Sequence, residues 1–98
     1  MNKHGEHICP VAQVASLLSD TWTMLIVRDV IKKPRRYKDL CESLEGISTR
    51  TLTLKLKRLV EEGIISHNDP YYEITEMGKN LGSIFDEMTK YGKKYLKK

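Results

Sequence analysis

The sequence predicts a mostly α-helical domain with one small β-hairpin. Apolar residues recur at helical spacing in four segments before Gly63. After Gly63, two short runs rich in β-branched and aromatic residues flank the turn-forming pair Asp69-Pro70. Helical spacing returns after Thr75. The expected order is therefore four helices, two strands and a final helix.

The size and charge of the chain suit a single domain with an anionic partner. Its 98 residues can bury only a small core, and a domain of this size often gains stability by pairing with itself. The formal net charge is +4, and the basic residues gather at five of the seven positions from Lys32 to Lys38 and in the segment 90–98. This charge agrees with an anionic partner such as nucleic acid, although it does not require one.

Cysteine content and hydropathy predict a cytoplasmic protein without a membrane segment. Cys9 and Cys41 are too few for the disulfide framework of a small secreted domain, so free thiols in a reducing compartment are expected. The longest uninterrupted apolar run, Met24 to Val27, is far shorter than the roughly 18 residues that a membrane span needs. No apolar signal segment follows Lys3.

The chain is expected to divide into a short arm and one domain. Residues 1–8 are polar and predict a flexible N-terminal arm, and residues 9–98 form the domain. Pro10 is favourable at the first position of a helix, and apolar residues recur from there to Leu18. The first helix is therefore expected over residues 10–18.

The next three helices are expected to contain a helix-turn-helix. The second helix can be capped by Ser19, Asp20 or Thr21 and ends before Pro34, because a proline ring does not fit inside a helix. The third helix is expected over residues 37–44. A turn containing a glycine, residues 45–48, separates it from the fourth helix, which is expected over residues 48–62. Two helices joined by so short a turn predict that the second one enters a major groove.

The fourth helix has two different sides. Ser48 is suited to cap its first amides, and Gly63 can take the left-handed conformation favoured after a helix end. One side is apolar and is expected in the core: Leu52, Leu56, Leu59 and Val60. The other side carries hydroxyl groups, cations and one leucine: Thr49, Arg50, Thr53, Leu54, Lys57 and, at its end, Glu61. This side predicts a recognition surface, and the alternative is an ordinary amphipathic helix with a basic face.

The segments after Gly63 complete a winged helix. Residues 64–68 and 71–74 are expected to pair as a hairpin around Asp69-Pro70, which gives the wing. Thr75 can cap a last helix with a long apolar stripe: Met77, Leu81, Ile84, Phe85, Met88, Tyr91 and Tyr95. That stripe is longer than one small domain can cover.

Three groups of residues are candidates for DNA contact. The fourth helix offers a base- and phosphate-reading set in which Arg50 can grip guanine with two hydrogen bonds: Ser48, Thr49, Arg50, Thr53, Leu54 and Lys57. Cations at the start of the third helix can neutralise phosphates, unless they belong only to a solvated basic loop: Arg35, Arg36 and Lys38. The wing tip adds His67 and Asn68, which can touch phosphate or the minor groove. Lys55 and Arg58 lie at the flanks and are expected to be solvated, and Tyr37 to be packed.

Cys9 is a candidate thiol sensor. It stands just before Pro10, and the partial positive charge at a helix N-terminus favours a thiolate. Cys41 lies on the apolar side of the third helix and is expected to be a buried small side chain. His4, His7 and Cys9 could be interpreted as a zinc-binding arm, but three ligands within six residues of a flexible arm are weak evidence, so no metal site is expected. No cofactor is expected either.

Taken in order, these segments resemble the HxlR-type branch of winged helix-turn-helix regulators, a relative of the MarR group. The residues that carry the resemblance run from Cys9 to about Leu81: Cys9-Pro10-Val11, Trp22-Thr23, Leu25-Ile26, Arg28, Pro34-Arg35-Arg36-Tyr37, Leu40, Gly46-Ile47-Ser48, Leu52-Thr53, Leu56, Leu59, Glu61, Gly63 and Ile74-Thr75-Glu76-Met77-Gly78. The resemblance implies a homodimer paired through its terminal helices, sequence-specific DNA binding and no catalysis. It also implies a redox role for Cys9, since many members carry a cysteine there and some use it as a switch.

Two departures from the family pattern alter what is expected. The family's longer wing is replaced by a tight turn at Asp69-Pro70, so deep contact with the minor groove is not expected from it. The family's Gly-Gly-Lys before the tryptophan is Ser19-Asp20-Thr21, which replaces a cation by an acid, so no phosphate contact is expected from that corner.

The sequence thus predicts a homodimeric transcription regulator that binds a palindromic operator and responds to an oxidant or small molecule. The alternative is a winged-helix adaptor that binds another protein through Leu54 and the tyrosine-rich wing, without sequence-specific DNA binding. No Ser-His-Asp order, phosphate-cradling glycine loop or closed metal set is present in the sequence, so an enzyme is not expected.

Overall fold

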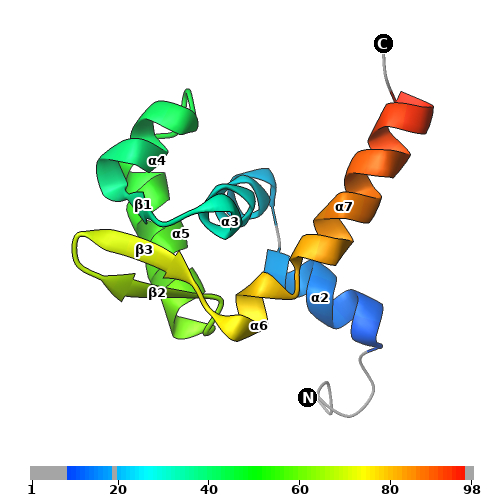
Figure 1. Cartoon of the computed structure of the whole chain (residues 1–98), viewed down its shortest axis with the longest axis horizontal. Helices are drawn as coiled ribbons and strands as arrows, with labels where there is room; N and C mark the ends of the chain where they lie inside the picture. Colours follow the sequence, from blue (N-terminus) through cyan, green and yellow to red (C-terminus); the bar gives the residue numbers. More distant parts are fainter. Residues whose placement is uncertain (1–8, 19, 97–98) are drawn as a thin grey trace.

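A computed structural model of the chain describes residues 9–18 and 20–96 and has the expected winged-helix architecture (Figure 1). The predicted flexible arm, with His4 and His7, lies outside the described residues. The elements follow in the order α2 (Pro10–Leu18), α3 (Thr21–Lys32), β1 (Arg35–Arg36), α4 (Tyr37–Ser43), α5 (Thr49–Glu61), β2 (Ile65–Asn68), β3 (Tyr71–Ile74), α6 (Glu76–Lys79), α7 (Gly82–Tyr91) and a π-helical segment (Gly92–Leu96).

Local capping explains where the recognition-helix candidate α5 begins and ends. The Ser48 hydroxyl accepts a hydrogen bond from the Thr51 amide at 3.0 Å, which satisfies one of the first amides of the helix. At the other end Gly63 has φ of +81°, and the Ile64 amide reaches back to the Leu59 carbonyl at 3.0 Å. The predicted span of residues 48–62 is therefore confirmed, cap residues included.

The wing is part of a three-stranded antiparallel sheet with the order β1-β3-β2. β2 and β3 pair as predicted, with His67 opposite Tyr72, and their turn holds a cis peptide bond between Asp69 and Pro70. β1 was not predicted. Arg35 pairs with Tyr72, so the strand that carries the first basic residues also lies along the wing.

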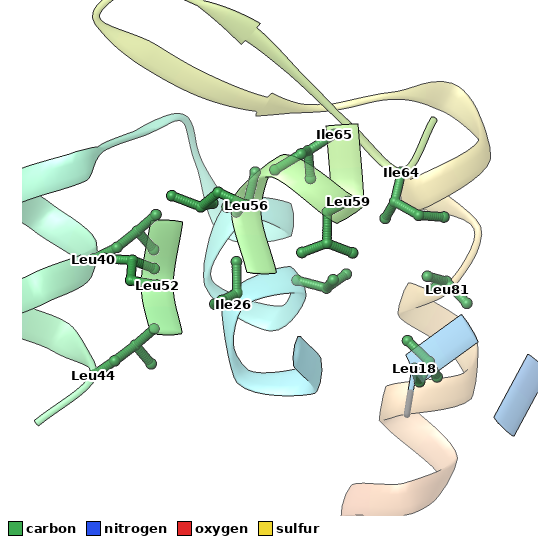
Figure 2. Packing of buried hydrophobic residues seen from close by; sticks show 12 residues of the cluster. Leu18, Ile26, Leu40, Leu44, Leu52, Leu56, Leu59, Ile64, Ile65 and Leu81 are labelled. Carbon is green, nitrogen blue, oxygen red and sulfur yellow. The ribbon is translucent and has the colours of Figure 1, made fainter. Parts of the chain in front are cut away.

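The core lies between α3, α4, α5 and the first residues of the hairpin. Figure 2 shows side chains from all of these elements converging on one cluster, in which the largest fully buried ones are Ile26, Leu40, Leu52, Leu56, Leu59, Ile64 and Ile65. Leu18 of α2 and Leu81 meet at the edge of the same cluster. The predicted core side of α5 is confirmed for its three leucines but wrong for Val60, which is 38% exposed at the end of the stripe.

The prediction of one continuous last helix is wrong, because the chain breaks between α6 and α7. The Asn80 side chain donates to the Glu76 carbonyl at 3.0 Å, the acceptor that a continuing helix would offer to the Asn80 amide. Gly82, the first residue of α7, is also a poor helix former. Met77, assigned to the apolar stripe, lies in the short α6 and is exposed.

The helices α2 and α7 stand together on the side of the molecule away from the sheet (Figure 1). The radius of gyration is 14.5 Å, larger than the about 13 Å of a compact domain of 100 residues. The excess agrees with a last helix that projects from the core and buries no residue completely. Among the described residues, no helix is both long enough and apolar enough to cross a bilayer.

Candidate nucleic-acid interface

The polar side of α5 points away from the core. All five of the predicted contact residues within the helix are exposed: Thr49, Arg50, Thr53, Leu54 and Lys57. Leu54 has 54% of its surface accessible in the middle of this side, where its methyl groups can meet an apolar partner such as a thymine methyl. The exposed face therefore combines hydrogen-bonding, cationic and apolar groups on one helix, as a base-reading surface requires.

Two hydroxyl side chains, those of Ser48 and Thr51, interact at the N-terminus of α5. Ser48 accepts from the Thr51 amide and donates its own proton to the Thr51 hydroxyl oxygen at 2.9 Å. Because the proton of Ser48 is used in this way, the Thr51 hydroxyl keeps its own proton for an acceptor such as a phosphate oxygen. Thr51 was missed in the sequence, where it falls between the apolar and polar sides.

Tyr37 joins α4 to the exposed side of α5. Its hydroxyl donates to the Thr49 carbonyl at 3.1 Å and lies 3.0 Å from the Thr53 hydroxyl oxygen. Tyr37 is also packed against the core, as expected. Its second role was missed, because nothing in the spacing of residues 37, 49 and 53 shows that they meet.

The predicted phosphate-binding cations differ in how they are held. The Arg35 Nε donates to the Asp29 carbonyl at 2.9 Å, which holds this side chain at the end of α3. Arg36 lies 3.6 Å from the Asp39 carboxylate, which also accepts from the Arg36 amide at 2.9 Å. That amide hydrogen bond outweighs the small cost of burial, and with the Arg36 charge it lowers the pKa of Asp39. Lys38 is exposed on α4.

Asp29 is a buried acid that links α3, β1 and α4. Its carboxylate accepts from Arg28 at 2.9 and 3.1 Å and from the Ser43 hydroxyl at the end of α4. Only 3% of Asp29 is exposed, so these bonds supply the partners that a buried charge requires. With Arg35 on its carbonyl, Asp29 fixes β1 and α4 relative to α3. The sequence placed it among apolar positions but did not show this role.

An ion pair ties α5 to the residue that caps α3. Lys55, expected to be solvated, donates to the carboxylate of Asp20, which also caps α3 through the Thr23 amide at 2.8 Å. The acid that replaces the family's cation before the tryptophan thus has an intramolecular partner.

The side chains at the wing tip are tied into the hairpin. The His67 ring stacks on the Tyr72 ring with centroids 4.1 Å apart, and Asn68 donates to Glu73 at 2.9 Å. Burial raises the pKa of Tyr72, and Tyr37 and Asp69 raise it further. His67 and Asn68 are therefore held rather than extended toward a groove, and any contact with DNA uses the exposed edges that remain.

Cys9 is exposed at the N-terminus of α2, and its sulfur accepts from the Ala12 amide at 3.4 Å. Cys41 is half-buried against the core, and both thiols are free. Within residues 9–18 and 20–96 no cluster of ligands could hold a metal ion. Beside Cys9 an apolar groove of about 550 Å³ runs between α2 and α7, lined by Pro10, Val11, Val14, Ala15, Leu18, Met24, Ile84 and Met88.

Comparison with known families decides the assignment. A family model for HxlR-like helix-turn-helix proteins matches residues 17–98. The chain belongs to the HxlR-like helix-turn-helix family. The family consists of transcription regulators, so the HxlR-like chain carries the fold and the helix-turn-helix of a DNA-binding regulator.

Relatives of this HxlR-like chain include named regulators. The HTH-type transcriptional regulator sll1512 of Synechocystis sp., itself uncharacterised, is 37% identical over 92% of this chain and 72% of its own length. The HTH-type transcriptional regulator YodB of Bacillus subtilis is 32% identical over 86% of this chain and 82% of its own length.

Solved structures agree with the fold. The quinone-bound form of YodB from B. subtilis superposes with a TM-score of 0.83 at 31% identity, and the match covers 89% of this chain and 100% of the crystallised YodB chain. The redox regulator HypR in its oxidised form superposes with a TM-score of 0.77 at 26% identity, and the match covers 92% of this chain and 100% of the HypR chain in that structure.

Proposed function

We propose that the HxlR-like chain is a cytoplasmic homodimer that binds a palindromic operator sequence-specifically. Its affinity for that operator changes when Cys9 reacts with an electrophile or oxidant. It acts by DNA binding and not by catalysis. The observation that carries the proposal is the exposed side of α5, which combines hydroxyl groups, cations and Leu54 and carries no acid before Glu61.

Each part of the interface has a role under this proposal. Arg50 reads guanine, while Thr53 and Leu54 meet base edges and a thymine methyl. The positive charges of Lys57, Lys38 and the two arginines of β1 neutralise phosphates. The arginines donate to phosphate oxygens through the guanidinium N–H groups that are not hydrogen-bonded within the protein. Ser48 and the first amides of α5 place the helix N-terminus toward the phosphate backbone, where its dipole favours a negative charge. The short wing contributes through His67 and Asn68 at its edge.

The groove between α2 and α7 supports pairing of two copies. The chain exposes Met88, which lines that groove, and further along Tyr91 of α7 and Tyr95 of the π-helical segment. Water contact with so many large apolar groups is unfavourable. A second copy that supplies the same two helices would cover both surfaces in an isologous dimer. Such a dimer presents two α5 helices to successive major grooves, about one helical turn apart.

Cys9 lies where a covalent change would alter that pairing. It directly precedes Pro10 and Val11, which line the groove. The relatives YodB, crystallised with bound quinone, and HypR, a redox regulator, support the same class of effector for this chain. An adduct on the Cys9 sulfur would change how α2 packs against the partner copy and therefore the spacing of the two α5 helices.

Selection from randomised duplexes, followed by binding at several salt concentrations, tests the proposal. Wild type should enrich a two-fold symmetric site, and its log affinity should fall linearly with log salt. Arg50→Ala should lose discrimination at one guanine per half-site by about 1–3 kcal/mol. The control Lys79→Ala removes a cation from α6, outside the proposed interface, and should leave the selected sequence unchanged. Equal binding to all duplexes would instead favour the protein adaptor.

A further inference from the structure

The hydroxyl of Tyr37 is inserted between two groups of the recognition helix α5. It lies 3.1 Å from the Thr49 carbonyl oxygen and 3.0 Å from the Thr53 hydroxyl oxygen. A carbonyl can only accept, so the single proton of Tyr37 has to point at Thr49 for the first contact to be a hydrogen bond. The second contact is then a hydrogen bond only if Thr53 donates to Tyr37.

This arrangement determines what Thr53 can offer outward. Its one hydroxyl proton is directed at Tyr37, so only lone pairs of the Thr53 oxygen remain for a partner in the solvent. Thr53 lies between Arg50 and Lys57 on the exposed side of α5, three residues from the first and four from the second. An acceptor there matches the amino groups of adenine and cytosine in the major groove, whereas guanine and thymine present acceptors to that groove.

We propose that Tyr37 is a positioning residue that makes Thr53 an acceptor and so gives each half-site a preference for adenine or cytosine at the base facing Thr53. The inference rests on the proposed function, since it requires α5 to lie in a major groove. It adds a specificity determinant in α4 that does not itself touch DNA. It also separates Thr53 from a phosphate-binding role, because a phosphate oxygen needs a donor.

Three features of the surroundings favour a fixed Tyr37. The ring packs against the core, and its residue directly follows β1, whose Arg35 pairs with Tyr72 of the wing. Tyr72 is in turn held by the stacked His67 ring. The Tyr37 hydroxyl therefore sits on a supported ring, and the preference it imposes on Thr53 does not depend on a mobile side chain.

Removing the Tyr37 hydroxyl releases the Thr53 proton. In Tyr37→Phe the Thr53 hydroxyl can turn toward the Thr49 carbonyl or toward a base. The Thr49 carbonyl already accepts a hydrogen bond from the Thr53 amide within the helix, so it keeps a partner when the Thr53 hydroxyl turns away from it, and that turn costs little free energy. Thr53 then accommodates either a donor or an acceptor on the base opposite.

The experiment is a set of affinity measurements on operator duplexes that vary one base pair at a time. Thr53→Val keeps the shape of the side chain but lacks the oxygen. The base pair at which this variant loses the preference shown by wild type is the one that Thr53 contacts. At that position wild type should prefer adenine or cytosine by about fivefold, the value of one hydrogen bond. Tyr37→Phe should reduce the preference to about twofold or less at that position alone. Ser83→Ala, which removes a hydroxyl from α7 outside the groove, should leave it intact.

A double variant separates a specific role from a structural one. In the Thr53→Val background, adding Tyr37→Phe should change no base preference, because the group through which Tyr37 acts is gone. Two results would overturn this inference and leave the proposed function standing. In the first, wild type has base preferences and Tyr37→Phe keeps all of them. In the second, Tyr37→Phe still changes a preference in protein that already lacks the Thr53 hydroxyl. A wild type without any base preference would overturn the proposed function as well.

Discussion

The ammonium group of Lys55 is hydrogen-bonded to the carboxylate of Asp20, so the recognition-helix candidate α5 is tied to the residue that caps α3. Burial would raise the pKa of Asp20, but the hydrogen bonds from Lys55 and the Thr23 amide outweigh it, and the pKa lies below its ordinary value of 3.8. A lowered pKa means that the charged Asp20 stabilises the folded state above that ordinary value. This contribution is lost as the pH falls through the lowered pKa.

Asp20→Asn should therefore lower the free energy of unfolding at pH 7 by less than about 1 kcal/mol, because both partners are partly exposed and asparagine still caps a helix. The difference from wild type should shrink as the pH is lowered below 3.8, which urea unfolding at a series of pH values would measure. Lys55→Gln should reproduce most of the effect. A difference that stays constant at all pH values would contradict the role of the pair.

Gly78 of α6 is required by close packing. A Cβ at this position would lie 2.2 Å from the Ile64 carbonyl oxygen and 2.7 Å from the Ile74 Cδ1. Gly78→Ala should lower the free energy of unfolding by about 1–3 kcal/mol, since the backbone would have to shift. Gly82→Ala is the matched control, because a Cβ there meets nothing within 4 Å, and it should be neutral or slightly stabilising. Equal effects of the two changes in denaturant unfolding would be inconsistent with this contact.

The apolar groove between α2 and α7 should carry the dimer. Met88 lines that groove and is 48% exposed in one copy. Met88→Glu should raise the dimer dissociation constant roughly tenfold or more, because pairing would bury an unpaired charge. Sedimentation velocity over a concentration series measures it, with Ser83→Glu as the control that places the same charge on α7 outside the groove. A dimer unaffected by Met88→Glu would locate the interface elsewhere.

Cys9 should account for the response to electrophiles. Treatment with a benzoquinone should weaken operator binding of wild type by about fivefold or more, a common size for coupling between two sites. Cys9→Ser should bind the operator normally and be insensitive to the reagent, whereas Cys41→Ser should respond like wild type. Anisotropy titrations before and after treatment measure both. A response that persists in Cys9→Ser would assign the sensing to another group.

The parts of the fold that could be predicted are those fixed by local chemistry. Ser48 and Gly63 bound α5 because a hydroxyl cap and a left-handed glycine act within a few residues. Spacing likewise identified the leucines of the core side. The exposure of the polar side of α5 followed from the same period.

The parts that were missed depend on contacts between distant segments. β1 is a strand only because it pairs with β3, and two residues carry no period. The contact of Tyr37 with Thr53 and the links made by Asp29 join elements whose relative placement the sequence does not contain. The break after α6 has a local cause, because the side-chain amide of Asn80 competes for one backbone carbonyl. In the sequence a single asparagine is a weak indication of a helix end beside a regular apolar stripe.

The most direct test of α5 as a major-groove reader is methylation protection on the selected operator. Dimethyl sulfate attacks guanine at N7, an atom that faces the major groove and that Arg50 would cover. The wild-type dimer should protect one guanine in each half-site, related by two-fold symmetry, and Arg50→Ala should restore methylation at those two guanines while the dimer stays bound at higher protein concentration. Undiminished methylation under saturating wild-type protein, or protection that Arg50→Ala leaves unchanged, would contradict the account.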